Sequence, residues 1–152
     1  MKTIILLVSF AFCSIISFSQ KIYYVQDKAY NTNASDLNKG TELNYPWATW
    51  QKAFNTALAG DTVYFRGGVW FPTTWVINDG NRSGHSGTHD RPICFFNYPG
   101  ETPIIDFSHY PYTISKSGLD IRNVTYVKLK GLTIRNNLQI VKDQWVNGLQ
   151  NL

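Results

Sequence analysis

The chain has 152 residues, of which 43% are hydrophobic and only 16% are charged. Disordered tails and coiled coils carry more charge and fewer aromatic residues, so this composition excludes both and predicts one domain with a buried core. The formal net charge is +4, from 14 Lys and Arg against 10 Asp and Glu, and no four basic residues occur in a row. We therefore expect no nucleic-acid partner.

Residues 1–19 have the pattern of an export signal. Lys2 supplies a positive charge, residues 4–18 are mostly apolar, and Ser17 and Ser19 place small residues two apart, as a signal-peptidase site requires. A transmembrane anchor is the alternative, but this stretch falls short of the roughly 20 apolar residues that span a bilayer. We expect a secreted, periplasmic or cell-surface protein that does not associate with the membrane after cleavage.

The two cysteines offer little chemistry. Cys13 lies inside the predicted signal, where the bulky Phe12 before it disfavours lipid attachment. After cleavage Cys94 alone remains, so no intrachain disulfide can form. Cys94 lies in the apolar run 93–96, which favours a small buried hydrophobic residue over a reactive thiol.

A strand over residues 21–25 and a polar stretch over 31–44 precede a predicted helix over 47–58. The apolar residues of this helix recur at intervals of three and four, and they are Trp47, Trp50, Phe54, Ala57 and Leu58. Pro46 suits a helix entry and Gly60 suits a C-terminal cap. The helix therefore has one strongly aromatic face that must pack against the rest of the domain.

Strands dominate the chain after Gly60. The longer ones are expected over 61–66, 93–98 and 126–130, with shorter ones over 69–71, 104–107, 119–121 and 132–134. Val63, Ile93 and Val127 are 30 and 34 residues apart, and the residues between them show no helical pattern. Strands that recur at one long interval favour a solenoid, although an antiparallel sandwich would also contain many short strands.

The segment 127–137 favours the solenoid. Two strands with alternating apolar residues flank Gly131, which permits a sharp bend, and two asparagines follow that suit a left-handed turn. A one-residue bend is too short for an antiparallel hairpin. In a solenoid Val63, Phe95 and Leu129 would point inward, and the predicted helix would cover the open end, with Trp50 and Phe54 on the first rung.

Several segments together resemble secreted bacterial right-handed parallel β-helix proteins of the pectate-lyase-like polysaccharide lyase superfamily. They are Tyr23-Tyr24-Val25, Pro46-Trp47-Ala48-Thr49-Trp50-Gln51-Lys52-Ala53, Ala59-Gly60-Asp61-Thr62-Val63-Tyr64-Phe65-Arg66-Gly67-Gly68, Tyr98-Pro99-Gly100-Glu101-Thr102-Pro103-Ile104-Ile105-Asp106 and Gly131-Leu132-Thr133-Ile134-Arg135-Asn136. The resemblance implies an all-β fold in which residues 21–137 form an N-terminal capping α-helix and the first few rungs. Residues 138–152 do not begin with the Gly and Asn turn that should open a further rung, so we expect an irregular or truncated tail and a fragment of a longer solenoid.

The resemblance also implies a function. In the lyases of this superfamily a groove along one parallel sheet binds an acidic polysaccharide, aspartates hold calcium, and a basic residue removes a proton. None of these catalytic groups can be assigned to residues of this chain, so no cofactor is identified and calcium is expected only in full-length family members. We expect a monomeric fragment, inactive alone, of a polysaccharide-degrading protein. The alternative is a non-catalytic extracellular module that binds carbohydrate or has a structural role.

Exposed aromatic and basic residues are the candidates for binding an extracellular polysaccharide, with an acidic one favoured, since aromatic faces stack on sugar rings and cations pair with carboxylates. The candidates are Trp75, Tyr110, Tyr112, Arg66, Arg91, Lys128 and Lys130. Trp70, Phe71, Arg82 and Arg135 belong to the same class. For Trp70 and Phe71 the alternative is core packing, and for the basic residues it is solubility.

Metal binding is a weaker hypothesis. His85, His89 and Asp90 could supply ligands, but glycines and hydroxyl residues between the histidines favour an ordinary solvated loop within the long loop expected over residues 72–92. Asp27 and Asp36, with Glu42, lie near the polar N-terminal stretch without the dense alternation of a calcium loop. The sequence therefore predicts no metal site.

Overall fold

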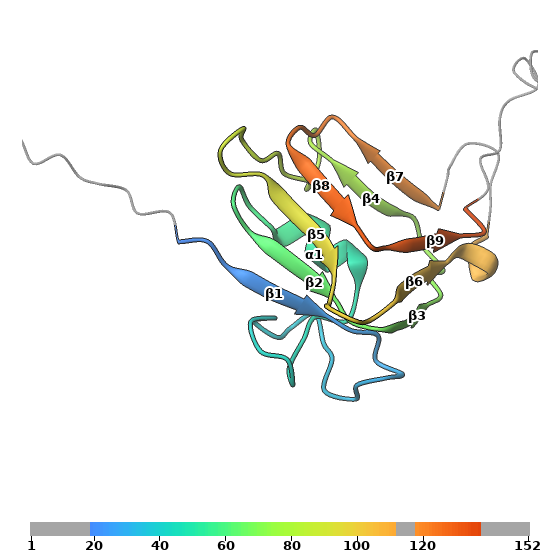
Figure 1. Ribbon diagram of the computed structural model, residues 1–152. Helices are drawn as coiled ribbons and strands as arrows, with labels where there is room; N and C mark the ends of the chain where they lie inside the picture. Colours follow the sequence, from blue (N-terminus) through green and yellow to red (C-terminus); the bar gives the residue numbers. More distant parts are fainter. Residues whose placement is uncertain (1–18, 112–117, 138–152) are drawn as a thin grey trace, which may run out of the picture.

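The computed structural model describes residues 19–111 and 118–137. Within these ranges the chain forms the helix α1 (Trp50–Thr56), the 3-10 helix η1 (Phe107–His109) and nine strands (Figure 1). The strands are β1 (Ile22–Val25), β2 (Thr62–Phe65), β3 (Gly68–Trp70), β4 (Val76–Asp79), β5 (Ile93–Asn97), β6 (Pro103–Asp106), β7 (Leu119–Arg122), β8 (Val127–Lys130) and β9 (Thr133–Arg135). Tyr112, the tail 138–152 and nearly all of the predicted signal lie outside the described residues.

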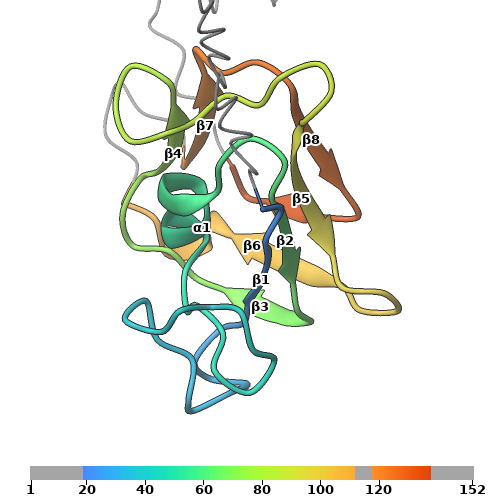
Figure 2. The ribbon, with the colours of Figure 1, turned by 90° about the vertical axis from the view of Figure 1, so that its left-hand side faces the viewer.

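The strands form three parallel sheets, in the orders β1–β2–β5–β8, β3–β6–β9 and β4–β7. The chain visits each sheet once per turn, first through β2, β3 and β4 and then through β5, β6 and β7, while β8 and β9 belong to a third turn (Figures 1 and 2). Each turn is one rung of a solenoid. The predicted parallel β-helix is therefore confirmed, and the antiparallel sandwich is excluded.

One strand of the first rung was harder to predict. β4 lies inside the range 72–92, where the sequence predicted only a loop, so that prediction was wrong. The strand has two apolar residues followed by Asn78 and Asp79, a pair that is typical of turns, yet both polar side chains are buried. Their burial in a strand shows that tertiary contacts outweighed the local preference of these residues.

Inward side chains stack from rung to rung in register. Val63 pairs with Phe95 and Phe95 with Leu129, so all three share the inner face of the first sheet, as predicted. Val63 and Phe95 are at most 1% exposed, whereas Leu129 is 40% exposed because no described strand covers β8. The bend after β8 takes two residues, Gly131 and Leu132, rather than the predicted one.

Cys94 does not lie in the core, contrary to the sequence prediction. Alternation along β5 buries Ile93 and Phe95 and turns Cys94 to the outer face, where it is half-buried. Its neighbours in register are Thr62 and Lys128. The four apolar residues in a row concealed the two-residue period that decides which side chains face inward.

The helix starts later than the predicted range 47–58. Trp47 still belongs to the first sheet, because it forms a parallel bridge with Val25. The Asp36 carboxylate then accepts hydrogen bonds from the backbone N–H groups of Ala48 and Thr49, at 2.9 and 3.0 Å, and from the Thr49 hydroxyl at 2.7 Å. Thr49 is extended and caps the helix. A long-range carboxylate thus fixes where the helix begins, so Pro46 does not start it.

The helix also ends earlier than predicted. Ala57 is already extended, so the helix stops at Thr56. Gly60 is therefore not its cap, and with φ at 96° it forms part of the turn into β2. This conformation is one that residues with a Cβ rarely adopt, which explains the glycine.

Aromatic side chains of the helix fill the end of the solenoid. The Trp50 ring lies 4.3 Å from that of Phe65 in the first rung, as predicted, while Phe54 lies 4.9 Å from Phe95 in the second rung. The four residues from Trp50 to Phe54 advance about 6 Å along the helix, close to the distance of about 4.8 Å between neighbouring strands. Phe54 therefore reaches one rung further than Trp50.

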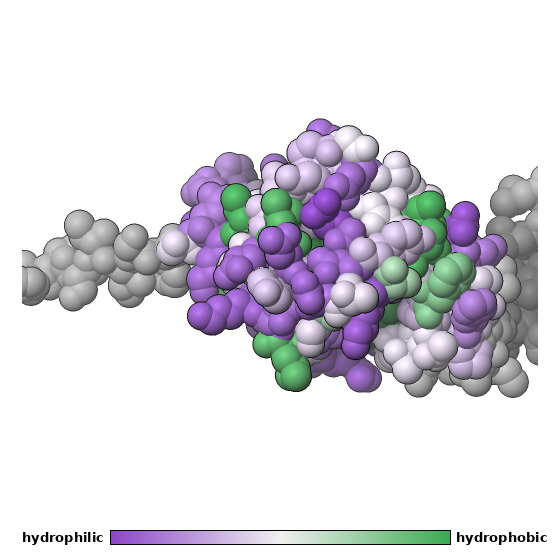
Figure 3. Space-filling model, turned by 90° about the horizontal axis from the view of Figure 1, so that it is seen from below, coloured by the Kyte–Doolittle hydropathy of each residue, from purple (hydrophilic) through white to green (hydrophobic). Residues whose placement is uncertain are grey.

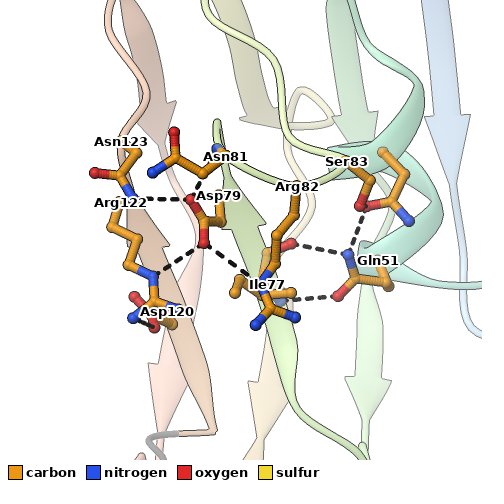
Figure 4. A network of polar contacts seen from close by, with 10 residues as sticks. Gln51, Ile77, Asp79, Asn81, Arg82, Ser83, Asp120, Arg122 and Asn123 are labelled. Atoms are coloured by element: carbon orange, nitrogen blue, oxygen red, sulfur yellow. Dashed lines mark hydrogen bonds and ion pairs between the residues drawn. The ribbon is translucent and has the colours of Figure 1, made fainter.

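The helix covers the free edge of β4 through one side chain. Gln51 Nε2 donates to the Ile77 carbonyl and the Ile77 N–H donates to Gln51 Oε1, both at 2.8 Å (Figure 4). The side-chain amide thereby makes the two hydrogen bonds that a neighbouring strand would make. This arrangement confirms that the helix covers the open end of the solenoid.

Buried aspartates join successive rungs. Asp79, at the end of β4, lies in register with Arg122 of β7, accepts from its Nε at 3.2 Å and accepts from Asn123 Nδ2 at 2.9 Å (Figure 4). The hydrogen bond from Asn123, followed by one from the Asn81 N–H, lowers the pKa of Asp79. Asn123 can reach the carboxylate because it adopts a left-handed conformation, with φ at 53°.

The same arrangement recurs in the second sheet. Asp106, at the end of β6, lies in register with Arg135 of β9 and accepts from Arg135 Nε at 2.6 Å and from Asn136 Nδ2 at 2.8 Å. These bonds, led by that of Asn136, hold the pKa of Asp106 well below its usual range. Asn136 has φ at 55°, which confirms the predicted left-handed turn at this residue. The repeated sequence Ile-Arg-Asn, at 121–123 and 134–136, is therefore a rung-to-rung clamp.

Candidate functional site

The outer face of the sheet β1–β2–β5–β8 carries a row of aromatic residues that ends in a cation. Tyr24, Tyr64, Phe96 and Lys130 lie side by side in register on the four strands, and we call them the outer row. Neighbours in such a row are about 4.8 Å apart, so the outer row crosses the whole sheet. Successive side chains of a strand point to opposite faces of the sheet, and each member of the outer row follows or precedes an inward residue of its strand. The members of the outer row therefore all face outward.

Tyr98 extends the aromatic surface beyond the end of β5. The Tyr24 and Tyr64 rings are stacked with centroids 6.3 Å apart, and the Tyr98 ring contacts both edge-on at 6.2 and 5.9 Å. All three rings are half-buried. Mutual contact restricts their motion while leaving ring surface exposed, which is what a stacking platform for a flat ligand requires.

A salt bridge supports Tyr98 from one side. Arg66 donates to Glu101 at 2.7 Å, and its guanidinium lies 4.6 Å from the centroid of the Tyr98 ring. The hydrogen bond with Glu101 raises the pKa of Arg66, and the same bond lowers the pKa of Glu101. Arg66 is therefore neutralised by a partner and positions Tyr98, rather than presenting a free positive charge.

Two lysines supply the net positive charge of this face. Lys128 and Lys130 are exposed on β8, in register with Cys94 and Phe96. Neither lysine forms an ion pair with another residue of the ranges 19–111 and 118–137. Their ammonium groups are thus available to an anionic ligand that lies along the outer row.

The other predicted binding residues are placed elsewhere. Trp75 is partly buried against the core and directly precedes β4, in the sheet β4–β7. The guanidinium groups of Arg82 and Arg122 lie 5.6 and 5.5 Å from the centroid of its ring. Tyr110 is 8% exposed and packs edge-on against Phe107 at 6.0 Å, so its ring has little free surface.

Arg91 lies against the turn before β2. A Cβ at Gly60 would lie 2.8 Å from Arg91 Nε, so the half-buried arginine occupies the space beside that glycine. Tyr112 lies outside the described residues. Of the predicted set, the structure therefore brings together Arg66, Lys128 and Lys130, while sequence reasoning missed Tyr24, Tyr64, Phe96 and Tyr98.

Trp70 and Phe71 have different environments in the structure. For both of them the sequence left sugar binding and core packing as alternatives. Trp70 is a core residue whose Nε1 donates to the Ala48 carbonyl at 2.9 Å. Phe71 is 44% exposed and stacks on His109 with ring centroids 4.6 Å apart.

The candidate metal ligands have other partners. His85 Nε2 lies 3.3 Å from the Asn55 carbonyl, whereas His89 pairs with Asp90 at 2.7 Å. Asp36 caps the start of the helix, as described above. In the described part of the chain no three His, Cys, Asp or Glu side chains are placed to hold a metal ion, and buried Asp79 and Asp106 are bound to arginines. These carboxylates do not fit a calcium site.

Comparisons with known proteins agree with this architecture. A family model described as "Pel9A-like, right handed beta helix region" matches residues 23–151. The chain is 32% identical over 116 residues to the uncharacterized protein YwoF of Bacillus subtilis, covering 68% of this chain and 21% of that protein. It is 36% identical over 81 residues to pectate lyase PEL9 of Emericella nidulans, and this match covers 53% of this chain and 18% of that protein.

The chain spans about a fifth of the length of these two relatives. A solved rhamnogalacturonan lyase has the same fold, with a TM-score of 0.57 and 24% identity over 75% of this chain and 28% of that one. No helix in the described ranges is long and apolar enough to cross a bilayer. Since the family match runs from β1 through the third rung and beyond, the chain belongs to the Pel9A-like family of right-handed β-helix proteins.

Proposed function

We propose that the outer row and the two lysines of β8 bind an acidic polysaccharide outside the cell, as the first rungs of a polysaccharide lyase. The outer row carries the proposal, because it combines stacked aromatic rings with ammonium groups on one flat sheet. Membership of the Pel9A-like family and similarity to a pectate lyase support a polysaccharide as the ligand.

The charge distribution favours an acidic chain over a neutral one. Arg66 is neutralised by Glu101, so Lys128 and Lys130 determine the net charge along the outer row. A uronate carboxylate near either ammonium group gains about 1 kcal/mol in water at 4 Å, which corresponds to about a fivefold change in affinity. The aromatic rings would take the apolar faces of the sugar rings.

The proposal concerns binding, because the described residues supply no set of groups suited to calcium. We propose that this chain alone binds without cleaving, and that residues 1–19 direct it out of the cell. Binding without chemistry would equally suit a non-catalytic module, so the two functions share this surface.

Isothermal titration of polygalacturonate into the full chain at low salt tests the proposal. We expect measurable binding that weakens about fivefold in Lys130→Ala, through loss of one charge pair, and by a similar factor in Tyr64→Ala, through loss of ring stacking. Lys39→Ala is the matched control, since it removes an exposed lysine from the N-terminal loop. Equal losses in the Lys39 and Lys130 variants would contradict a site on the outer row.

A further inference from the structure

A cavity of about 330 Å³ lies at the helix-covered end of the solenoid, away from the outer row. Its walls come from the start of α1, the end of β3, the following loop 71–74 and two residues of the N-terminal loop. Figure 2 shows α1 between β4 and the strands β1 and β2, at the end of the solenoid where the first rung begins. We call this cavity the end pocket. Its volume is at the lower limit for small-molecule sites, which span about 300–1,000 Å³.

Aromatic rings line one side of the end pocket. Trp50 and Trp70 are nearly fully buried, and their rings meet edge-on at 5.9 Å. Phe71 is the exposed member, and its stacking on His109 holds the ring in place. An exposed ring that is fixed by a neighbour offers a ready surface for the apolar face of a ligand.

Polar groups also line the end pocket. Asp27 and Lys28 both line the pocket, and their formal charges cancel, so these two residues give the lining no net charge. Threonine hydroxyls of the loop 71–74 add donors and acceptors. This lining differs from the surface at β8, where Lys128 and Lys130 form no ion pair within the described ranges.

Trp50 adds a second and independent observation. Its indole N–H is buried and has no hydrogen-bond partner in the described ranges. Trp70, by contrast, donates its indole N–H to a backbone carbonyl. Buried donors almost always have a partner, so this indole N–H, which belongs to a residue that lines the end pocket, is an exception.

The surrounding surface favours a small ligand over a protein partner. Figure 3 views the side formed by the N-terminal loop and β3, where hydrophobic residues occur as separate patches among hydrophilic ones. Stable protein interfaces need a larger continuous area.

We propose that the end pocket binds a neutral pyranose, as a sugar subsite separate from the outer row. The aromatic rings would take the apolar face of the sugar, while Asp27, Lys28 and the threonines would bind its hydroxyl groups. Because the formal charges of Asp27 and Lys28 cancel, the lining has no net charge to attract a uronate, and we expect a neutral sugar to bind better. A polysaccharide with neutral branches would then be held by two different parts of the same chain.

Titration of the full chain with D-xylose, D-galactose and D-galacturonate, followed by tryptophan fluorescence, tests this proposal, because Trp50 and Trp70 line the pocket. We expect saturable change with at least one neutral sugar and weaker binding of galacturonate. Phe71→Ala should weaken binding about three- to tenfold, which is the range for one aromatic contact. Tyr126→Ala, the control, removes an exposed ring beside β8 and should change binding less than twofold.

A competition experiment separates the two sites. Saturating polygalacturonate should leave the neutral sugar bound, because the outer row lies on a different sheet. No saturable change up to 100 mM sugar, equal binding by wild type and Phe71→Ala, or displacement by polygalacturonate would each overturn the proposal. Near-ultraviolet circular dichroism confirms that Phe71→Ala remains folded, which its exposed position leads us to expect.

Discussion

Replacing Gln51 tests whether one side chain substitutes for a missing strand at the end of the solenoid. Gln51→Ala removes both hydrogen bonds to Ile77 and leaves a partly buried carbonyl and N–H group without these partners. Each such bond contributes about 0.5–1.5 kcal/mol, so the loss is about 1–3 kcal/mol. Alanine is the better helix former by a few tenths of a kcal/mol, which leaves a net destabilisation of about 1–2.5 kcal/mol.

Urea unfolding followed by tryptophan fluorescence measures this loss. With a slope of about 1–3 kcal/mol per molar urea, the midpoint should fall by roughly 1 M while the slope stays unchanged. Lys52→Ala is the matched control, because it makes the same substitution one residue further along the helix. It removes a contact of the ammonium group with the Trp47 ring at 5.8 Å, worth about 0.5–1 kcal/mol, which the higher helix propensity of alanine offsets in part. Equal midpoints for the Gln51 and Lys52 variants would refute the idea that Gln51 completes the edge of β4.

Three further predictions follow from the fold. Hydrogen bonds lower the pKa of Asp79 and Asp106 below the ordinary 3.8, so the stabilisation that these carboxylates provide is present above that pH and is lost as the pH falls through and below it. The urea midpoint of the wild type should therefore drop from pH 6 to pH 3, and that of Asp106→Asn should drop less. A midpoint that does not change with pH would contradict the clamps. Phe95→Ala should cost about 3–5 kcal/mol, and Leu129→Ala clearly less since Leu129 is 40% exposed; equal losses on urea unfolding would speak against the stacking described. Incubation of the chain with polygalacturonate should give no unsaturated uronate absorbance with or without calcium, and clear turnover would show that it is active alone.

The sequence predicted the solenoid because its inner face follows a simple rule. Alternation around Val63, Phe95 and Leu129, combined with their spacing, favoured three strands in one sheet, and the short bend at Gly131 argued against an antiparallel pairing. The ends of the helix were less predictable. Asp36 lies 13 residues before Thr49, and only the folded N-terminal loop brings its carboxylate to the helix start.

The candidate site was only partly predictable for a related reason. Once Val63 and Phe95 are assigned inward, Tyr64 and Phe96 must face outward, so this part of the outer row was implicit in the sequence. The register of β1, and with it the place of Tyr24, depends on pairing with a strand about 40 residues away. The sequence predicted Arg66 as a partner for a ligand carboxylate, but Glu101 on the next rung already binds it.

The proposed function requires that charge on β8 lets the outer row hold an acidic chain. It is tested most directly by comparing the affinity of the full chain for polygalacturonate with that for its fully methyl-esterified form at low salt, in wild type and in Lys128→Ala/Lys130→Ala. Two charge pairs of about 1 kcal/mol each predict a preference of about 25-fold for the acidic polymer in wild type, which should nearly disappear in the double variant. Equal affinity of the wild type for both polymers, or an unchanged preference in the double variant, would contradict the account.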